Sequence, residues 1–149
     1  TESSPVDRRA VLASVADFIR NARLVTPDIS VQRRAIFKLY GMLEQRNPAT
    51  MKMNTWLNSN EKSTPFYRAT IETVDISIEA VLPQSNETWQ VDWIEHVYNR
   101  DGTPKHEPFR MRALLTVYIL PTSNQTSEKE IQENPLRIFI RDFSWTKQI

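Results

Sequence analysis

The feature that most constrains this chain of 149 residues is a change of hydrophobic period before its midpoint. Up to Leu57, apolar residues recur every three to four positions, which is typical of amphipathic helices. From about Phe66 they alternate with polar residues at every second position, which is typical of half-buried strands. Helices followed by strands, without interleaving, predict an α+β fold in which the helices pack on an antiparallel sheet.

Three helix starts share one pattern, a capping residue followed by proline. The pairs are Ser4–Pro5, Thr26–Pro27 and Asn47–Pro48, and Asp7 completes a capping-box-like spacing in the first of them. The first helix is expected to end near Arg23, which falls outside its apolar stripe and is expected to face water. The predicted stripes are Val11, Leu12, Val15, Phe18, Ile19 and Ala22 in the first helix; Ile29, Ile36, Leu39, Tyr40 and Leu43 in the second; and Met53, Trp56 and Leu57 in the third.

Four strands are predicted after the helices. They begin near Phe66, Trp89, Arg110 and Leu136, and turn signals lie at Ser85–Asn86 and Asp101–Gly102. The third strand is apolar on both faces at its far end, which places it centrally in the sheet. In the fourth, alternation puts Ile138 and Ile140 on one face and Phe139, Arg141 and Phe143 on the other. A short helical turn is expected from Ser127 to Glu133.

These elements form one domain over residues 1–149, a curved sheet cupping the first two helices with a groove left at one end. The four tryptophans are expected in the core and along that groove, since burial of each contributes a few kcal/mol by order of magnitude.

Composition excludes several classes of function. The chain has two glycines and no cysteine, so it has neither a glycine-rich phosphate loop nor a disulfide framework. Its net charge is +1, and Arg33, Arg34 and Lys38 lack interleaved aromatic residues, so we expect no direct binding of nucleic acid. No run approaches the ~18 apolar residues of a membrane span, yet the chain starts at Thr1 and not at Met, so we expect it to be part of a longer protein.

No catalytic or cofactor site is predicted, and no metal site. His96 and His106 lack a matching carboxylate pattern. One enzymatic alternative comes from the fold, because domains in which a curved sheet cups helices also host isomerases and dehydratases with an aspartate base and a tyrosine donor. Tyr40, Asp92 and Asp142 are the candidates for those roles. The favoured interpretation is that Tyr40 packs on its helix while both aspartates face solvent.

The segment Glu133–Trp145 resembles the close of TrbF family conjugal transfer proteins, a family related to the eighth VirB component of type IV secretion systems. Phe18–Arg23 and Trp89–Glu95 resemble the family's first helix and its "Phe-x-Val-x-Trp-x-Glu" strand. One departure is plain, because Arg137 replaces the glycine of the family's Asn-Pro-x-Gly motif. If that glycine takes a positive φ, Arg137 must take a costly conformation or the turn must change.

The resemblance implies a fold like nuclear transport factor 2 and a protein with a short cytoplasmic tail, one inner-membrane helix and this domain in the periplasm. It also implies a scaffold that binds other subunits, notably the VirB-ten-type bridging protein and core-complex proteins, and that forms a homodimer. The residues assigned to partner binding are Asn134, Pro135, Leu136, Arg137, Trp56 and Trp145. Those assigned to self-association are Arg9, Asp17 and Arg20, with an edge strand as the alternative surface. Asn134–Pro135 can equally be a rigid turn into the last strand.

Overall fold

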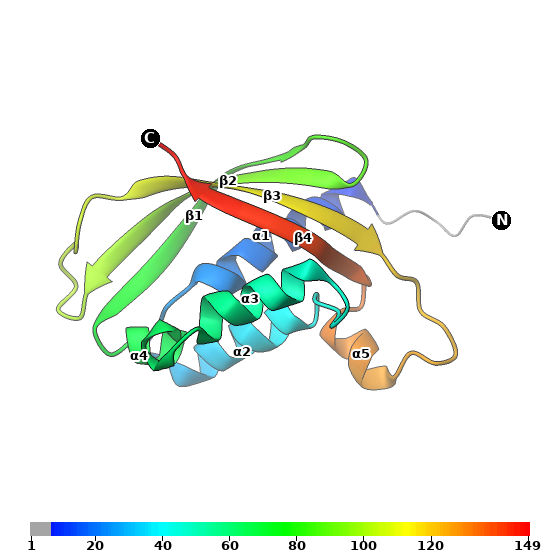
Figure 1. The fold of residues 1–149 in the computed structure, drawn as a ribbon, viewed down its shortest axis with the longest axis horizontal. Helices are drawn as coiled ribbons and strands as arrows, with labels where there is room; N and C mark the ends of the chain where they lie inside the picture. Colours follow the sequence, from blue (N-terminus) through cyan, green and yellow to red (C-terminus); the bar gives the residue numbers. More distant parts are fainter. Residues whose placement is uncertain (1–6) are drawn as a thin grey trace.

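The computed structural model describes residues 7–149, and it has helices packed on one face of a four-stranded antiparallel sheet (Figure 1). The predicted α+β order is confirmed. The helical elements are α1 (Arg8–Arg23), α2 (Ile29–Tyr40), α3 (Pro48–Asn58), a 3-10 turn (Glu61–Ser63), α4 (Pro65–Arg68) and α5 (Glu128–Glu133). The strands are β1 (Glu72–Pro83), β2 (Thr88–Asn99), β3 (Phe109–Ile119) and β4 (Ile138–Lys147).

Two of the three helix starts differ from the prediction. The Ser4–Pro5 pair lies outside the described residues, and the N-cap of α1 is Asp7, whose side chain accepts a hydrogen bond from the Arg9 N–H at 2.8 Å. The N-cap of α2 is Asp28 and not Thr26, because a carboxylate placed there accepts from two backbone N–H groups of the first turn. The start of α3 at Asn47–Pro48 is confirmed, although the Asn47 side chain donates to the Tyr118 hydroxyl and makes no cap bond.

The predicted start of the first strand near Phe66 is wrong. Phe66 lies in α4, which begins with a further cap-then-proline pair in which the Thr64 hydroxyl accepts from the Tyr67 N–H at 3.1 Å. The strand begins only at Glu72. The fourth strand likewise begins two residues after Leu136, because the preceding turn is still closing there.

The strands form a meander in the order β1-β2-β3-β4, so β1 and β4 are the edges and β3 is internal, as predicted. The far end of β3 is not buried on both faces, however, since Leu114 and Ile119 are exposed. The helices cover one face of the sheet, and an antiparallel sheet can leave its other face to water.

A bulge in β4 corrects the predicted faces of that strand. Thr116 pairs with Asp142 while Val117 pairs with Ile140, so Arg141 is an extra residue in β4. A bulge of one residue shifts the alternation by one position. Phe143 therefore lies in the same buried cluster as Ile138 and Ile140, where strict alternation had placed it on the opposite face.

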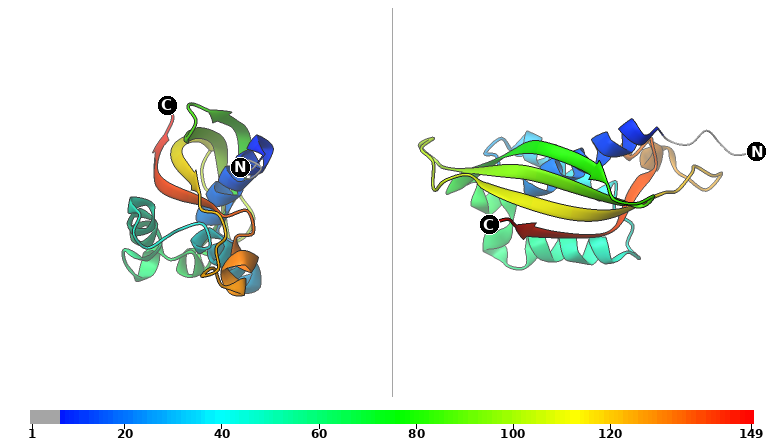
Figure 2. Two further views of the ribbon diagram at one scale, coloured as in Figure 1. Left: turned by 90° about the vertical axis from the view of Figure 1, so that its right-hand side faces the viewer. Right: turned by 90° about the horizontal axis from the view of Figure 1, so that it is seen from above.

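The helices form two layers beneath the sheet, which curves over them (Figure 2). α1 packs against β1 and β2, α3 packs against β4, and α2 packs on α1. The prediction that the sheet buries the stripe of the second helix holds only in part, since Leu39 lies in the core cluster with residues of the sheet whereas Ile29 is 57% exposed. Leu12 of α1 is also more exposed than its stripe position predicted. The core holds Trp93, Phe18, Leu115 and Met53, all nearly inaccessible to solvent.

Candidate partner-binding site

The structure brings two of the predicted partner-binding residues together. Trp56 on α3 and Trp145 on β4 meet edge to face, with ring centroids 5.4 Å apart. They line an open groove of about 510 Å³ between the helix and the strand. The other lining residues are Met51, Lys52, Thr55, Phe143 and Ser144.

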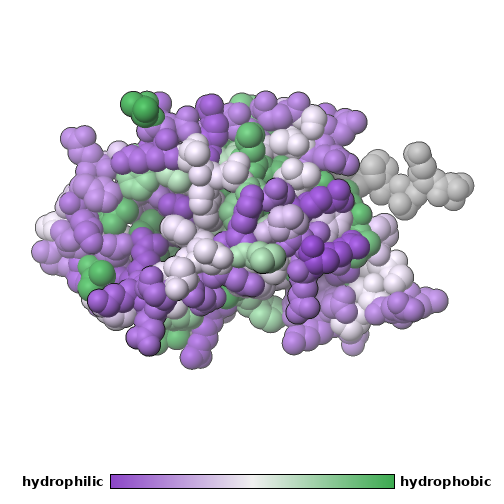
Figure 3. Space-filling model, viewed as in Figure 1, coloured by the Kyte–Doolittle hydropathy of each residue, from purple (hydrophilic) through white to green (hydrophobic). Residues whose placement is uncertain are grey.

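The groove is apolar on its walls and polar at its margin. Met51 is 71% exposed, a large apolar side chain presented to solvent. Lys52 crosses the groove from α3 and donates to the Asp142 carboxylate at 2.7 Å and to the Phe143 carbonyl at 2.9 Å. The surrounding surface of this face is mostly hydrophilic, with apolar atoms showing in separate places (Figure 3). An apolar strip edged by polar groups is the usual make-up of a protein interface.

A buried ion pair lies behind the two tryptophans. Arg23, the last residue of α1, pairs with Glu95 of β2 through two hydrogen bonds, one of them 2.9 Å long between Nη2 and Oε2. Only 10% of the Arg23 side chain and 3% of the Glu95 side chain are exposed. The Arg23 guanidinium lies 4.5 Å from the Trp56 ring and 4.7 Å from the Trp145 ring. Because a guanidinium stacks favourably on aromatic faces, the pair holds both rings in position.

This pair was not predicted from the sequence, and the expectation that Arg23 faces water is wrong. One signal was present, since alternation places Glu95 on the same face of β2 as Val91 and Trp93. A carboxylate on a buried face needs a cationic partner. The partner could not be identified, because it comes from a residue 72 positions away in the sequence.

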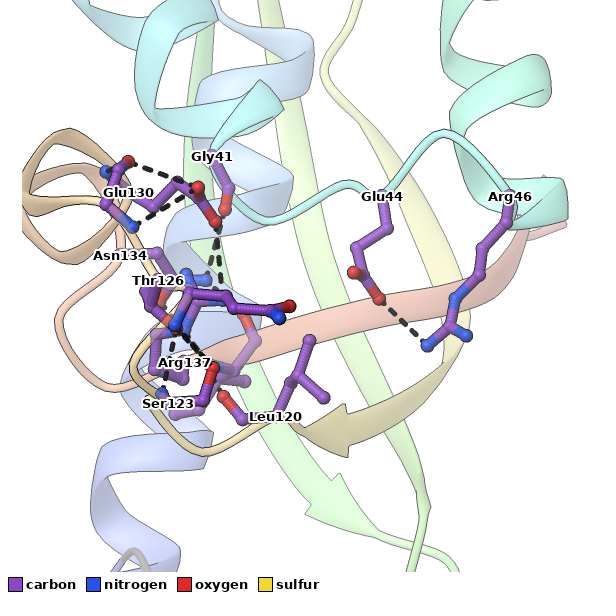
Figure 4. A network of polar contacts seen from close by, with 12 residues as sticks. Gly41, Glu44, Arg46, Leu120, Ser123, Thr126, Glu130, Asn134 and Arg137 are labelled. Atoms are coloured by element: carbon purple, nitrogen blue, oxygen red, sulfur yellow. Dashed lines mark hydrogen bonds and ion pairs between the residues drawn. The ribbon is translucent and has the colours of Figure 1, made fainter.

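The Asn134–Arg137 turn has two buried residues at its ends, Asn134 and Arg137, which Figure 4 shows among their polar contacts. Asn134 is buried, and its amide nitrogen donates to the Ile138 carbonyl at 2.8 Å and to the Gly41 carbonyl at 3.1 Å. Pro135 and Leu136 are exposed. The asparagine thus joins the turn to the end of α2, while the two exposed residues are free to meet another molecule.

Arg137 takes the conformation that its family position suggested. Its φ is +57°, in the left-handed region that favours glycine. The side chain is buried, its Nε donates to the Leu120 carbonyl at 3.2 Å, and its guanidinium lies 4.9 Å from the Phe139 ring. These contacts offset the backbone strain, so the turn keeps a positive φ without the glycine.

The residues assigned to self-association lie on the outer side of α1. Asp17 and Arg20 pair with each other at 3.0 Å, and Arg9 pairs with Asp7 at 3.2 Å. All of them are exposed. Exposed pairs of this kind contribute little to stability, so this surface can take part in contacts without unfolding the domain.

The structure does not bring the three candidate catalytic residues into one site. The Tyr40 hydroxyl donates to the Asn54 side chain at 2.5 Å, and burial raises the pKa of Tyr40. Asp92 pairs with Arg112 at 2.8 Å on the outer face of the sheet, opposite to Trp93. Asp142 is bound by Lys52 of α3, as described above.

Neither histidine takes part in a metal cluster. His96 stacks on Tyr98 and His106 packs beside Phe109. Over residues 7–149, no group of three or more histidine, aspartate or glutamate side chains could hold a metal ion. In the same part of the chain, no helix is both long and apolar enough to cross a bilayer.

Comparison with known proteins gives a consistent family. The VirB8 protein family model matches residues 1–148. The conjugal transfer protein TrbF of Rhizobium radiobacter is 38% identical over 143 residues, which are 96% of this chain and 62% of that protein. The chain therefore spans less than two thirds of the length of this relative.

Solved structures share the fold at low sequence identity. The soluble domain of TrwG from the type IV secretion machinery of Bartonella grahamii matches with a TM-score of 0.81 and 8% identity, over 99% of both chains. The VirB8 protein of Agrobacterium tumefaciens matches with a TM-score of 0.76 and 9% identity, over 99% of this chain and 98% of the other. The expected fold, like that of nuclear transport factor 2, is confirmed. The chain belongs to the VirB8 family of type IV secretion proteins.

Proposed function

We propose that this domain is a non-catalytic assembly component of a bacterial conjugation machine and that it binds other subunits in the periplasm. The observation that carries the proposal is the apolar groove between α3 and β4, whose two tryptophans are held from behind by a buried ion pair. Rigid aromatic side chains at the centre of a contact supply much of its binding energy. The likeness to a conjugal transfer protein supports the same assignment.

The partners we propose are sister subunits, namely the VirB-ten-type bridging protein and core-complex proteins. Trp56 and Trp145 would bury a partner side chain, and Pro135 and Leu136 would extend the contact at the far end of β4. Asn134 and Arg137 support the turn from inside and do not themselves reach the partner. A cytoplasmic tail and one inner-membrane helix are proposed in the longer protein, and protease accessibility of this domain in spheroplasts tests its periplasmic side.

We further propose that the domain forms a homodimer through the outer side of α1, around Arg9, Asp17 and Arg20. Leu12 is partly exposed on the same helix and would supply apolar contact beside these charges. Sedimentation equilibrium of the domain tests this proposal. A monomer at every accessible concentration would reject it.

The decisive experiment measures DNA transfer from donor cells that lack the gene and carry a plasmid-borne copy. The wild-type copy should restore transfer, and Met51→Glu should fail to restore it, because a charge then lies on the apolar wall of the groove. Met51 is so exposed that the substitution leaves the core intact. Leu82→Glu is the matched control, an exposed apolar residue on β1, and should restore transfer.

Two results would contradict the proposal. If donors without the gene transfer DNA normally, the domain is not an assembly component of that machine. If Met51→Glu and Leu82→Glu restore transfer equally at equal protein levels, the groove is not the contact.

A further inference from the structure

The outward-facing backbone groups of the edge strand β4 are covered along most of its length by other groups of this chain. The Asn134 side chain bonds both the N–H and the carbonyl of Ile138, in the way that a neighbouring strand would. The Met42 carbonyl accepts from the Ile140 N–H at 3.0 Å. The Phe143 N–H donates to the Asp142 carboxylate at 2.9 Å, and its carbonyl accepts from Lys52.

This cover ends at Trp145. The Gln148 N–H donates to the Arg110 carbonyl at 2.8 Å, and Arg112 stands opposite Thr146, so Thr146 and Gln148 direct their backbone groups toward β3. Because backbone direction alternates along a strand, Trp145 and Lys147 direct theirs away from the sheet. The hydrogen bonds among the described residues leave these two N–H and two carbonyl groups without a partner.

The open end of β4 lies beside the groove. Trp145 contributes its ring to the groove wall and its backbone to the open edge, and Lys52 and Lys147 lie on either side of it along the strand. Lys147 is exposed, on the same face as Trp145. Unpaired edge groups and an apolar groove meet at one place, and strand addition uses the first for affinity and the second for side-chain specificity.

We propose that the open end of β4 binds an extended segment of a partner subunit as a fifth strand. The segment places an aliphatic side chain opposite Trp145, in the groove, and an acidic side chain opposite Lys147. This inference rests on the proposed function and specifies how the groove would recognise its partner. A second copy of β4 fits less well, because antiparallel pairing through Trp145 and Lys147 places the two Lys147 side chains diagonally opposite on one face, with no acidic side chain to meet either of them.

A designed peptide tests this geometry on the isolated domain. The probe is a capped peptide of seven residues with threonine at the odd positions and glutamate, valine and glutamate at the even ones. With valine opposite Trp145, the even positions direct their N–H groups toward β4 and the odd ones direct theirs away. The readout is hydrogen exchange and NMR shift of the Trp145 and Lys147 amides.

The unmodified peptide should slow exchange at both amides. N-methylation at the even positions should weaken binding by about tenfold or more, because it removes the edge bonds, whereas N-methylation at the outward-facing threonines between them should leave binding unchanged. Replacing both glutamates with lysine should weaken it by roughly fivefold. The proposal is overturned if the two amides are unaffected, if both methylated peptides bind alike, or if the amides become protected with rising protein concentration alone.

Full-length variants separate this inference from the proposed function. Lys147→Pro removes one outward N–H and leaves the β3 ladder intact, and Lys147→Ala removes the same charge but keeps the N–H. The two domains should melt alike, and Lys147→Pro should lower DNA transfer by about tenfold relative to Lys147→Ala. Equal transfer by both variants overturns strand addition, whereas normal transfer without the gene overturns the assembly function itself.

Discussion

The buried Arg23–Glu95 pair gives a sharp prediction, because removing either partner leaves a charge in the core. Glu95→Leu leaves the Arg23 guanidinium without a partner among the tryptophans. Arg23→Met leaves the Glu95 carboxylate, whose side chain is 3% exposed, without a cation. Breaking a buried pair from one side costs about 3–5 kcal/mol, whereas replacing both partners with apolar groups is often neutral. The double variant Arg23→Met/Glu95→Leu should therefore be much more stable than either single variant.

Urea unfolding measures this difference. With an m-value of about 2 kcal/mol per molar urea, each single substitution should lower the midpoint by about 2 M. The double variant should lie within about 1 M of the wild type. The reasoning is refuted if each single variant costs less than about 1 kcal/mol, or if the double variant loses the sum of both, since either result means that the charges are not coupled in a dry core.

Two further outcomes follow from local contacts. Burial tends to raise the pKa of Glu72, but hydrogen bonds from Lys105 and Arg68 outweigh it and hold that pKa below the usual value for a glutamate. The stability that this carboxylate contributes is thus fully present above its pKa in the unfolded chain and is lost as pH falls through its pKa in the folded protein. In urea titrations, Glu72→Gln should therefore be less stable than wild type near pH 7, and the difference should shrink on acidification. At Arg137, glycine adopts φ +57° without strain and alanine only at a cost of about 1 kcal/mol, so Arg137→Gly should be more stable than Arg137→Ala by that amount in thermal melts. The opposite order would show that the turn relaxes.

Local patterns in the sequence were enough to predict the type and order of most elements. The hydrophobic periods near Phe18 and Trp93 reflect which side of each element is buried, and that side is set within a few residues. The capping residue with proline at Asn47–Pro48 and the turn around Gly102, whose φ is +89°, are equally local. The same patterns failed at Phe66, where a proline-capped turn and a strand compete over a few residues.

The groove was predictable only in its residue types. Trp56 and Trp145 stood out as large rings near the ends of their elements, but nothing in the sequence showed that they face each other 5.4 Å apart. Asn134 was predicted as either a turn residue or a contact. The structure shows it bonded within the chain, because its amide reaches the carbonyl of Gly41, 93 positions away.

The sequence by itself determined the fold class, the four antiparallel strands and the family, since these depend on periodicity and on motifs read in order along the chain. Only the tertiary structure decided three features: the pairing of Arg23 with Glu95, the bulge at Arg141 that turns Phe143 inward, and the cover of β4 that stops before Trp145. Each of these depends on contacts between distant segments. Such contacts form only when the helices and the sheet pack, and their free energy outweighs the preference of any single residue.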